Sequence, residues 1–192
     1  MEIILGSQSP RRRELMAGLD LPFTAINIDA DESYPADLQG GDIPYFISRA
    51  KAQAYVPNLQ PGQLLITADT IVWLNGHMLG KPHDDSEACA MLRALSGKTH
   101  QVFTAVTFAE KLSTFDFRLS TIVDKTDVTF AELTDEEIRH YLTRYRPLDK
   151  AGAYGVQEWI GYIACTSMQG SYFNVMGFPV QKVYEWLKKR GI

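Results

Sequence analysis

The sequence predicts an α/β fold built on a mixed β-sheet, and three observations lead to this prediction. In the first half of the chain, short apolar runs typical of buried strands alternate with segments typical of helices. Asn75-Gly76, a strong signal for a tight hairpin turn, follows the longest of these runs. Two long β-rich segments come next. Early β-α alternation followed by hairpins favours a sheet that contains both parallel and antiparallel pairs.

Strands are predicted where apolar or β-branched residues run together between turn signals. The buried run Ile3-Ile4-Leu5 ends at Gly6, and a longer run over 64–74 contains a single acidic residue. The predicted strands cover residues 2–6, 22–28, 64–74, 77–80, about 100–110, about 115–130 and 160–168.

Helices are predicted where helical periodicity meets capping signals. Ser9 is a natural cap for the first helix, and Pro10 suits its first turn because the missing N–H would be unpaired there. Asp42 is a candidate cap for the second helix, and Thr134 with Glu137 forms a capping box. The predicted helices cover residues 10–19, 43–55, 86–95, Thr134 to about 144, and Pro179 to Gly191. The stretches Asp29–Asp42 and 147–158 are expected to be loops, the first of them mobile.

Composition limits the classes of function. At 192 residues, the chain is long enough for one compact domain or two small lobes, with an ordinary hydrophobic content of 45%. A formal net charge of −4 argues against long nucleic acid as a partner, since such partners usually need a broad basic face. Cys89 and Cys165 form no CxxC pattern and fit a reducing cytosol. No signal peptide, membrane span or histidine-based zinc site is expected from the sequence.

Residues 7–13, Ser-Gln-Ser-Pro-Arg-Arg-Arg, place three arginines at the start of the first predicted helix. A helix start carries partial positive charge, so cations are unfavourable there. A bound anion would explain them, because free N–H groups, serine hydroxyls and guanidinium groups together form a phosphate site. The alternative is a solvated basic helix start.

Asp69 lies inside an otherwise apolar strand, between Ala68 and Thr70. An ionised carboxylate buried without a partner is costly, so Asp69 must meet a cation or metal, or emerge at a strand end or bend. It is either half of a structural ion pair or a functional metal ligand or general base. Asp31-Glu32 is a second acidic pair, in a polar loop. Two carboxylates near a phosphate site can hold Mg²⁺ or Mn²⁺, because phosphates and waters complete the coordination.

Two lysines and a glutamine complete the candidate residues. Lys51 has the spacing of an ordinary surface lysine on its helix, whereas Lys81 is held in a turn between Gly80 and Pro82. Gln157 carries a donor and an acceptor that can read a base edge, although an ordinary loop glutamine has the same pattern. No Gly-x-Ser-x-Gly motif or cysteine–histidine pair stands out as a nucleophile. Arginines, lysines and carboxylates without a nucleophile favour metal-assisted attack of water on a phosphate.

Taken together, these segments resemble the Maf family of nucleoside triphosphate pyrophosphatases over nearly the whole chain. Any one motif is weak, but in this order and at these spacings the set is highly specific. The matching motifs are Ser7-Gln8-Ser9-Pro10-Arg11-Arg12, Ala50-Lys51-Ala52, Ala68-Asp69-Thr70, Gly80-Lys81-Pro82, Leu95-Ser96-Gly97 with His100 and Val102, Asp149–Gln157, Gly170-Ser171, and Asn174-Val175 with Gly177-Phe178-Pro179.

The resemblance implies a single Maf-like domain over residues 1–192. Its fold would be an elongated mixed sheet flanked by helices, in two lobes with a cleft between them, as in inosine triphosphatase-like proteins. The implied activity is hydrolysis of a nucleoside triphosphate to the monophosphate and pyrophosphate with a divalent cation, Mg²⁺ or Mn²⁺. A cytoplasmic location fits this activity, and a homodimer is compatible with the family.

The resemblance also assigns roles to residues. Asp69 is implied as the proton acceptor that activates water, and Glu32 joins it around the metal. Whether Asp69 acts as base, metal ligand or both is left open. The groups implied to engage the triphosphate are Ser7, Arg11, Arg12, Lys51 and Lys81.

Within the family, Arg11, Thr70 and the segment Asp149–Gln157 are similar to the branch that acts on dTTP and UTP. Arg11, Thr70 and Gln157 are therefore the candidates for base specificity. Glu158 stands where glycine is common and adds negative charge beside the base-reading segment. The alternatives are a Maf-type pyrophosphatase with another base preference, for 7-methyl-GTP or broad, and a nucleotide-sensing regulator of septum formation without significant turnover.

Overall fold

The chain forms an α/β structure with a mixed sheet, as predicted. The computed structural model describes residues 1–113 and 116–192. The strands are β1 (Glu2–Gly6), β2 (Phe23–Ile26), β3 (Gln63–Leu74), β4 (His77–Leu79), β5 (Thr99–Lys111), β6 (Phe117–Phe130) and β7 (Cys165–Gln169). The helices are α1 (Pro10–Ala17), α2 (Asp42–Tyr55), α3 (Asp85–Leu95), α4 (Asp135–Tyr145), α5 (Trp159–Ala164), α6 (Tyr172–Met176) and α7 (Val180–Lys188), with 3-10 turns η1 (Val56–Asn58) and η2 (Ala151–Ala153).

Strand pairing is parallel at one end of the strand order and antiparallel at the other. The order is β2-β1-β3-β5-β6-β7, with β4 paired to β3. β1 runs parallel to both β2 and β3, so that Leu5 lies opposite Ala25 on one side and Ile66 on the other. β4 pairs antiparallel with β3, and β7 antiparallel with β6. The predicted mixture of parallel and antiparallel pairs is therefore confirmed.

The chain divides into two compact units. The first contains Met1–Asp69, Thr104–Asp124 and Gly177–Ile192, and the second contains Thr70–Phe103 and Lys125–Met176. The strands β3, β5 and β6 each contribute residues to both units. These two compact units correspond to the two lobes that were expected.

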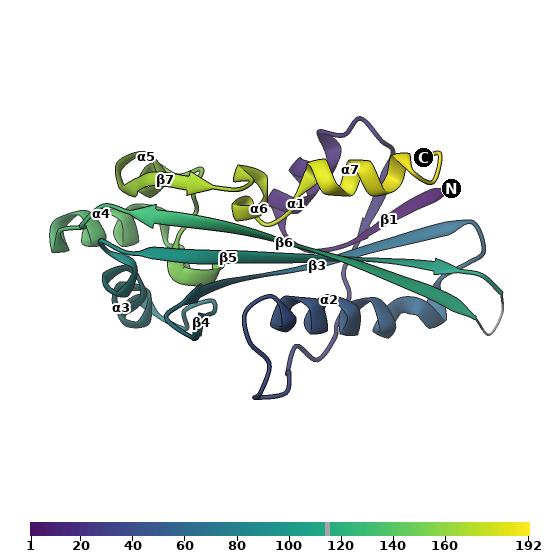
Figure 1. Ribbon diagram of the computed structural model, residues 1–192, viewed down its shortest axis with the longest axis horizontal. Helices are drawn as coiled ribbons and strands as arrows, with labels where there is room; N and C mark the ends of the chain where they lie inside the picture. Colours follow the sequence, from purple (N-terminus) through teal and green to yellow (C-terminus); the bar gives the residue numbers. More distant parts are fainter. Residues whose placement is uncertain (114–115) are drawn as a thin grey trace. The chain divides into compact units, whose positions relative to one another are not determined.

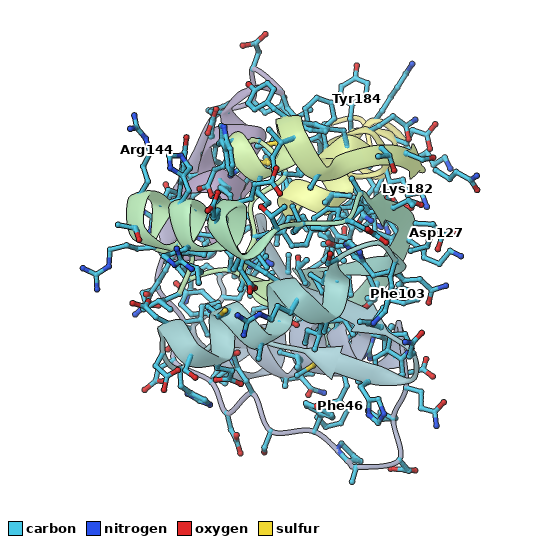
Figure 2. The ribbon with its side chains drawn as sticks, turned by 90° about the vertical axis from the view of Figure 1, so that its left-hand side faces the viewer. Phe46, Phe103, Asp127, Arg144, Lys182 and Tyr184 are labelled. Carbon is cyan, nitrogen blue, oxygen red and sulfur yellow. The ribbon has the colours of Figure 1, made fainter. Side chains whose placement is uncertain are left out.

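In the first unit, α2 and α7 cover opposite faces of the strands (Figure 1). Ala52 of α2 packs with Ala109 of β5 in one apolar cluster. The preceding residue of β5, Phe108, stacks on Trp186 of α7 with ring centroids 3.8 Å apart. This alternation follows from strand geometry, because consecutive side chains point to opposite faces. On the outer side of α7, Tyr184 is partly exposed at the surface (Figure 2).

In the second unit, the core forms between α3, α4 and the adjoining parts of the long strands. Leu92 of α3, Ile138 of α4 and Phe130 of β6 belong to one buried cluster. The predicted hairpin turn at Asn75-Gly76 is confirmed, with φ of 50° and 84° at the two positions. Positive φ at both central residues is what the tight turn requires, and it explains the Asn-Gly pair.

Three local predictions need correction. Residues 160–168 were expected to form one strand, but the chain is helical through α5 before β7 begins at Cys165. Ile160 and Ala164 are fully buried and four residues apart, which is a helical spacing that a short apolar run hides. Asp42 is not the cap of α2, because Gly41 holds that position and Asp42 lies in the first turn.

The third correction concerns the ends of two elements. The first helix stops at Ala17 instead of continuing to residue 19. The last helix, expected from Pro179 to Gly191, is confined to Val180–Lys188, with Pro179 as its N-cap. The expected start of a strand at about residue 115 lies outside the described residues. Over the described part of the chain, no helix has both the length and the apolar character needed to cross a membrane.

Candidate active site

The turn between β1 and α1 places the first candidate residues. A Cβ at Gly6 would collide with Ile28, so glycine lets the end of β1 pack closely. Ser7 is buried and its Oγ accepts a hydrogen bond from the Ser9 N–H at 3.2 Å. Ser9 caps α1, since its Oγ accepts from the Arg12 N–H at 3.4 Å. The predicted cap and helix start are confirmed.

Two of the three arginines at this helix start hold backbone carbonyls. The Arg12 Nε donates to the Gly177 carbonyl at 2.8 Å, which ties α1 to the segment before α7. The Arg13 Nε donates to the Ser7 carbonyl at 3.1 Å and closes the serine turn. Arg13 is exposed, whereas Arg11 and Arg12 are partly buried. The basic helix start is therefore held by hydrogen bonds to backbone carbonyls and is not only a solvated run of charges.

Arg12 shares an electrostatic environment with both acidic candidates. Burial lowers the pKa of Arg12, and Arg11 lowers it further, while Asp69 and Glu32 raise it. The group stays cationic, since arginine is not deprotonated in proteins. Because Asp69 and Glu32 stabilise its charge, Arg12 lies within electrostatic reach of both carboxylates.

Lys51 joins these two carboxylates directly. Its Nζ lies 2.8 Å from Asp69 Oδ1 and 2.9 Å from Glu32 Oε1. The side chains of Lys51 and Asp69 are only 13% and 12% exposed, whereas Glu32 is 56% exposed. The spacing-based prediction of a surface lysine is wrong, because α2 turns this position inward, next to Ala52, which is fully buried.

A chain of buried hydroxyl groups fixes the helix that carries Lys51. Thr67 Oγ1 of β3 donates to the Ser48 carbonyl of α2 at 2.7 Å. Ser48 Oγ and Thr107 Oγ1 lie 2.9 Å apart. These bonds tie α2 to β3 and β5 one helical turn before Lys51, and Thr67 is two residues before Asp69. Sequence reasoning missed this support, since serine and threonine gave no distinctive pattern.

The two acidic residues of the 29–42 loop have different roles. Asp31 accepts from the Ser33 N–H and from the Ser33 hydroxyl, both at 2.8 Å. These hydrogen bonds lower the pKa of Asp31, which is exposed. Asp31 therefore closes a local turn, and Glu32 is the residue that reaches Lys51.

Three further candidates, Thr70, Lys81 and Gln157, belong to the second unit. Thr70 follows Asp69 directly in β3 and is partly buried. Lys81 is exposed and lines an open cavity of about 560 Å³, together with Met78 and Met91. The predicted placement of Lys81 after the β3–β4 hairpin is confirmed.

Gln157 lies in a turn with a buried amide oxygen. The Glu158 N–H donates to the Gly155 carbonyl at 2.9 Å, so residues 155–158 form a turn. Among the described residues, the buried Gln157 Oε1 has no hydrogen-bond partner. A buried acceptor without a donor is costly and calls for an explanation, such as a ligand that supplies the donor.

The structure thus groups one set of candidates within the first unit. Arg11, Arg12, Glu32, Lys51 and Asp69 are linked by ion pairs or by electrostatic effects on Arg12. Cations and carboxylates in such proximity can bind an anionic ligand together with its counter-ion.

Comparisons with known proteins find relatives over nearly the whole chain. The family model described as Maf-like protein matches residues 2–190. A dTTP/UTP pyrophosphatase of Bacteroides thetaiotaomicron is 57% identical over 189 residues, which cover 98% of this chain and 95% of that protein. The dTTP/UTP pyrophosphatase of Porphyromonas gingivalis strain W83 is 52% identical over 193 residues, which cover 99% and 94%.

A solved structure supports the fold. The Ham1 protein of Staphylococcus aureus has a TM-score of 0.56 and 13% identity, and the match covers 99% of this chain and 100% of that chain. At this level of identity, the likeness concerns the fold alone.

Proposed function

Because this chain belongs to the Maf family, we propose that it hydrolyses dTTP and UTP to the nucleoside monophosphate and pyrophosphate. The observation that carries the proposal is the Lys51 ammonium held between Asp69 and Glu32, with Arg12 in the same field. Relatives named dTTP/UTP pyrophosphatase align over nearly the full chain.

A serine hydroxyl and four cationic side chains would bind the triphosphate. Ser7, Arg11, Arg12, Lys51 and Lys81 are the residues proposed for this role. Lys51 would exchange a carboxylate partner for a phosphate oxygen when the nucleotide enters. Fixed positive charge aimed at phosphate oxygens stabilises the charge that develops on the leaving pyrophosphate.

The donor set fits a divalent cation. Glu32 and Asp69 each place an oxygen within 2.9 Å of one ammonium group, so the two carboxylates are close enough to share a cation. Among the described residues, no group of three or more His, Cys, Asp or Glu side chains is arranged to hold a metal. Mg²⁺ typically takes one or two carboxylates and completes its coordination with substrate phosphates and water. When bound, Mg²⁺ or Mn²⁺ would neutralise phosphate oxygens.

Asp69 would then act as the proton acceptor. A water oxygen forms a bond to the α-phosphorus, and Asp69 takes a proton from that water. The bond between the α-phosphorus and the oxygen that bridges to the β-phosphate breaks, and pyrophosphate leaves. Arg12, anchored on the Gly177 carbonyl, would keep a fixed positive charge beside Asp69 during this step.

Base preference would come from Arg11, Thr70 and Gln157. The unpaired Gln157 Oε1 is an acceptor. The N3–H of uracil and thymine is a donor, whereas N3 of cytosine has a lone pair and no hydrogen. A buried acceptor that pairs with only one of two ligands discriminates strongly between them, because the other ligand leaves it unsatisfied.

A nucleotide panel tests the proposal. Pyrophosphate release would be measured with Mg²⁺ for dTTP, UTP, CTP, GTP and 7-methyl-GTP, before and after chelation of the metal. We expect the highest kcat/KM for dTTP and UTP and loss of turnover on chelation. Asp69→Asn should lower kcat by about 100-fold or more, whereas Asp127→Asn, a carboxylate paired with Lys125 on β6, should leave it unchanged.

Each contrary result would reject a different part of the proposal. Preference for a purine nucleotide would reject the proposed pyrimidine specificity but would leave the proposed hydrolysis to monophosphate and pyrophosphate in place. Nucleotide binding without pyrophosphate release after Mg²⁺ is restored would reject the enzymatic proposal in favour of a sensor. Near-wild-type turnover of Asp69→Asn would reject its role as proton acceptor.

We also propose a cellular compartment and an oligomeric state for this activity. Cys89 and Cys165 are free thiols, which agrees with a reducing compartment such as the cytoplasm. We propose a homodimer as the functional assembly, to be tested by light scattering of the purified protein.

A further inference from the structure

The turn that carries Gln157 is held at both ends by one phenol. Gly155 and Glu158 are the first and last residues of the turn, and Tyr141 of α4 contacts both. The Gly155 N–H donates to the Tyr141 hydroxyl at 3.0 Å. The same hydroxyl donates a hydrogen bond to Glu158 Oε2. The hydroxyl thus uses its donor and an acceptor position at once, on opposite ends of one turn.

Burial makes this contact selective for the neutral phenol. Tyr141 is among the fully buried side chains of the second unit. Burial, with the hydrogen bond to Glu158, raises the pKa of Tyr141 above its ordinary value. The hydroxyl therefore keeps its proton, which the bond to Glu158 requires.

The charge of Glu158 is balanced inside the same group. Lys150, which is only 8% exposed, places its Nζ 3.1 Å from Glu158 Oε1 and 2.8 Å from Asp149 Oδ1. Both oxygens of Glu158 are thus used, one by Tyr141 and one by Lys150. The negative charge of Glu158 is therefore paired instead of facing a ligand. The charge that this glutamate adds beside the base-reading segment is thus balanced.

Glycine at 155 makes room for this group. A Cβ at Gly155 would lie 2.9 Å from the Glu158 Cδ and 3.1 Å from the Lys150 Cε. The first distance is shorter than real Cβ atoms show and the second is tight, so a larger residue at 155 would force the Glu158 and Lys150 side chains to shift. Val156, next in the turn, is buried in the apolar core and anchors its middle. Among the described groups of this turn, Gln157 Oε1 stands out as a buried polar atom without a partner.

We propose that Tyr141, Glu158 and Lys150 are positioning residues that fix the 155–158 turn and thereby hold the Gln157 amide toward the pyrimidine base. This inference rests on the proposed function, since it assigns the group to base selection in that reaction. The residues act through Gln157 and do not contact the triphosphate. Their loss should therefore reduce the preference for UTP over CTP more than it reduces turnover.

The test uses the full-length protein and the ratio of kcat/KM for UTP to that for CTP. Tyr141→Phe removes one hydroxyl and both of its hydrogen bonds. We expect the ratio to fall about fivefold to tenfold, mainly through a higher KM for UTP. The matched control is Tyr145→Phe, because Tyr145 lies on the same helix and stacks on Tyr141, with ring centroids 5.1 Å apart. This control should keep the wild-type ratio.

A double-mutant cycle separates positioning from general structure. In a Gln157→Ala background, adding Tyr141→Phe should not change the ratio further, because the amide on which the phenol acts is already absent. If the two effects multiply, or if Tyr141→Phe alone leaves the ratio within about twofold of wild type, the inference is overturned.

A milder variant covers the case in which Tyr141→Phe does not fold. Glu158→Gln keeps an oxygen acceptor for the phenol and removes the attraction to Lys150, and we expect a fall of a few-fold in the ratio. An unchanged ratio in a folded Glu158→Gln protein would also count against the inference. An inactive wild-type protein would reject the proposed function itself, which keeps the two failures apart.

Discussion

One ammonium group, on Lys51, forms ion pairs with two carboxylates in the first unit. It bonds Asp69 and Glu32 at nearly equal distances, 2.8 and 2.9 Å. Two carboxylates near one point repel each other unless a cation lies between them. In this structure, the Lys51 ammonium is that cation. In the proposed function, a divalent ion would lie near the same two carboxylates, so the ammonium and the ion would have overlapping electrostatic roles.

Lys51→Met tests this overlap, because methionine keeps much of the aliphatic stem and removes the charge. In metal-free protein, we expect the free energy of unfolding to fall by about 1–3 kcal/mol, since a largely buried carboxylate loses its partner. Mg²⁺ should restore more stability to the variant than to wild type. Urea unfolding with and without Mg²⁺ measures both effects.

The matched control for this experiment is Lys125→Met. Lys125 pairs with Asp127 at 3.0 Å, but its side chain is 45% exposed. Exposed pairs contribute little, so this variant should keep near-wild-type stability and the wild-type response to Mg²⁺. Equal stability of Lys51→Met and wild type without metal would show that the two carboxylates do not depend on this lysine.

Single residues also show where sequence reasoning reaches its limit. Asp69 was expected either to meet a cation or metal or to emerge at a strand end or bend, because an unpaired buried carboxylate is costly. Its cation could not be identified, since Lys51 looks like any surface lysine when only helical spacing is known. Tyr141 was missed for a similar reason: its hydroxyl donates to Glu158 and accepts from the Gly155 N–H, and nothing local to α4 points to either partner.

At the scale of elements, α4 matters because it carries the phenol that holds the Gln157 turn. Its first turn is closed by a capping box, in which the Glu137 N–H donates to Thr134 Oγ1 at 3.2 Å and the Thr134 N–H donates to Glu137 Oε2 at 2.7 Å. The box satisfies two helix-terminal donors that would otherwise need water.

Thr134→Ala should lower the free energy of unfolding by about 1 kcal/mol, because it removes the cap acceptor. Urea unfolding would show a lower midpoint with an unchanged slope. Thr143→Ala is the matched control on the same helix, since the exposed Thr143 hydroxyl only bonds the Arg139 carbonyl within the helix, at 2.8 Å. A loss for Thr143→Ala as large as that for Thr134→Ala would mean that the capping box adds nothing specific.

Elements set by local chemistry were predicted well. The Ser9 cap, the Asn75-Gly76 turn and the Thr134 capping box each depend on residues within a few positions of one another. The segment after Gln157 was not, because Ile160 and Ala164 satisfy a short helix and a short strand equally well. Packing in the second unit determines which of the two forms, and packing cannot be inferred from a short apolar run.

At the scale of the molecule, the candidate residues are divided between two compact units. Ser7, Arg11, Arg12, Glu32, Lys51 and Asp69 belong to the first, and Thr70, Lys81 and Gln157 belong to the second. The order and spacing of motifs along the chain, through the resemblance to the Maf family, led to this set as a prediction, whereas the alternation of strand and helix signals led to the fold class.

Stability of the whole protein should depend on pH through His100. This residue is fully buried, with Nε2 2.8 Å from the Tyr154 hydroxyl and an edge-on contact to Phe130. Burial lowers the pKa of His100 from 6.5 to about 4. Between these values the unfolded chain binds a proton that the folded chain does not, so stability falls as the pH is lowered through this range.

The loss should reach about 3 kcal/mol at the acid end of that range, and urea unfolding at neutral pH and at mildly acidic pH measures it. His100→Asn should unfold more easily at neutral pH, because the ring contacts are lost, but its stability should change less between the two conditions. The control is His77→Asn, at an exposed position beside the hairpin turn, which should keep the wild-type slope. Since carboxylates also titrate at low pH, the diagnostic quantity is the difference in slope between His100→Asn and wild type. A wild-type slope in His100→Asn would mean that another buried group carries the acid sensitivity.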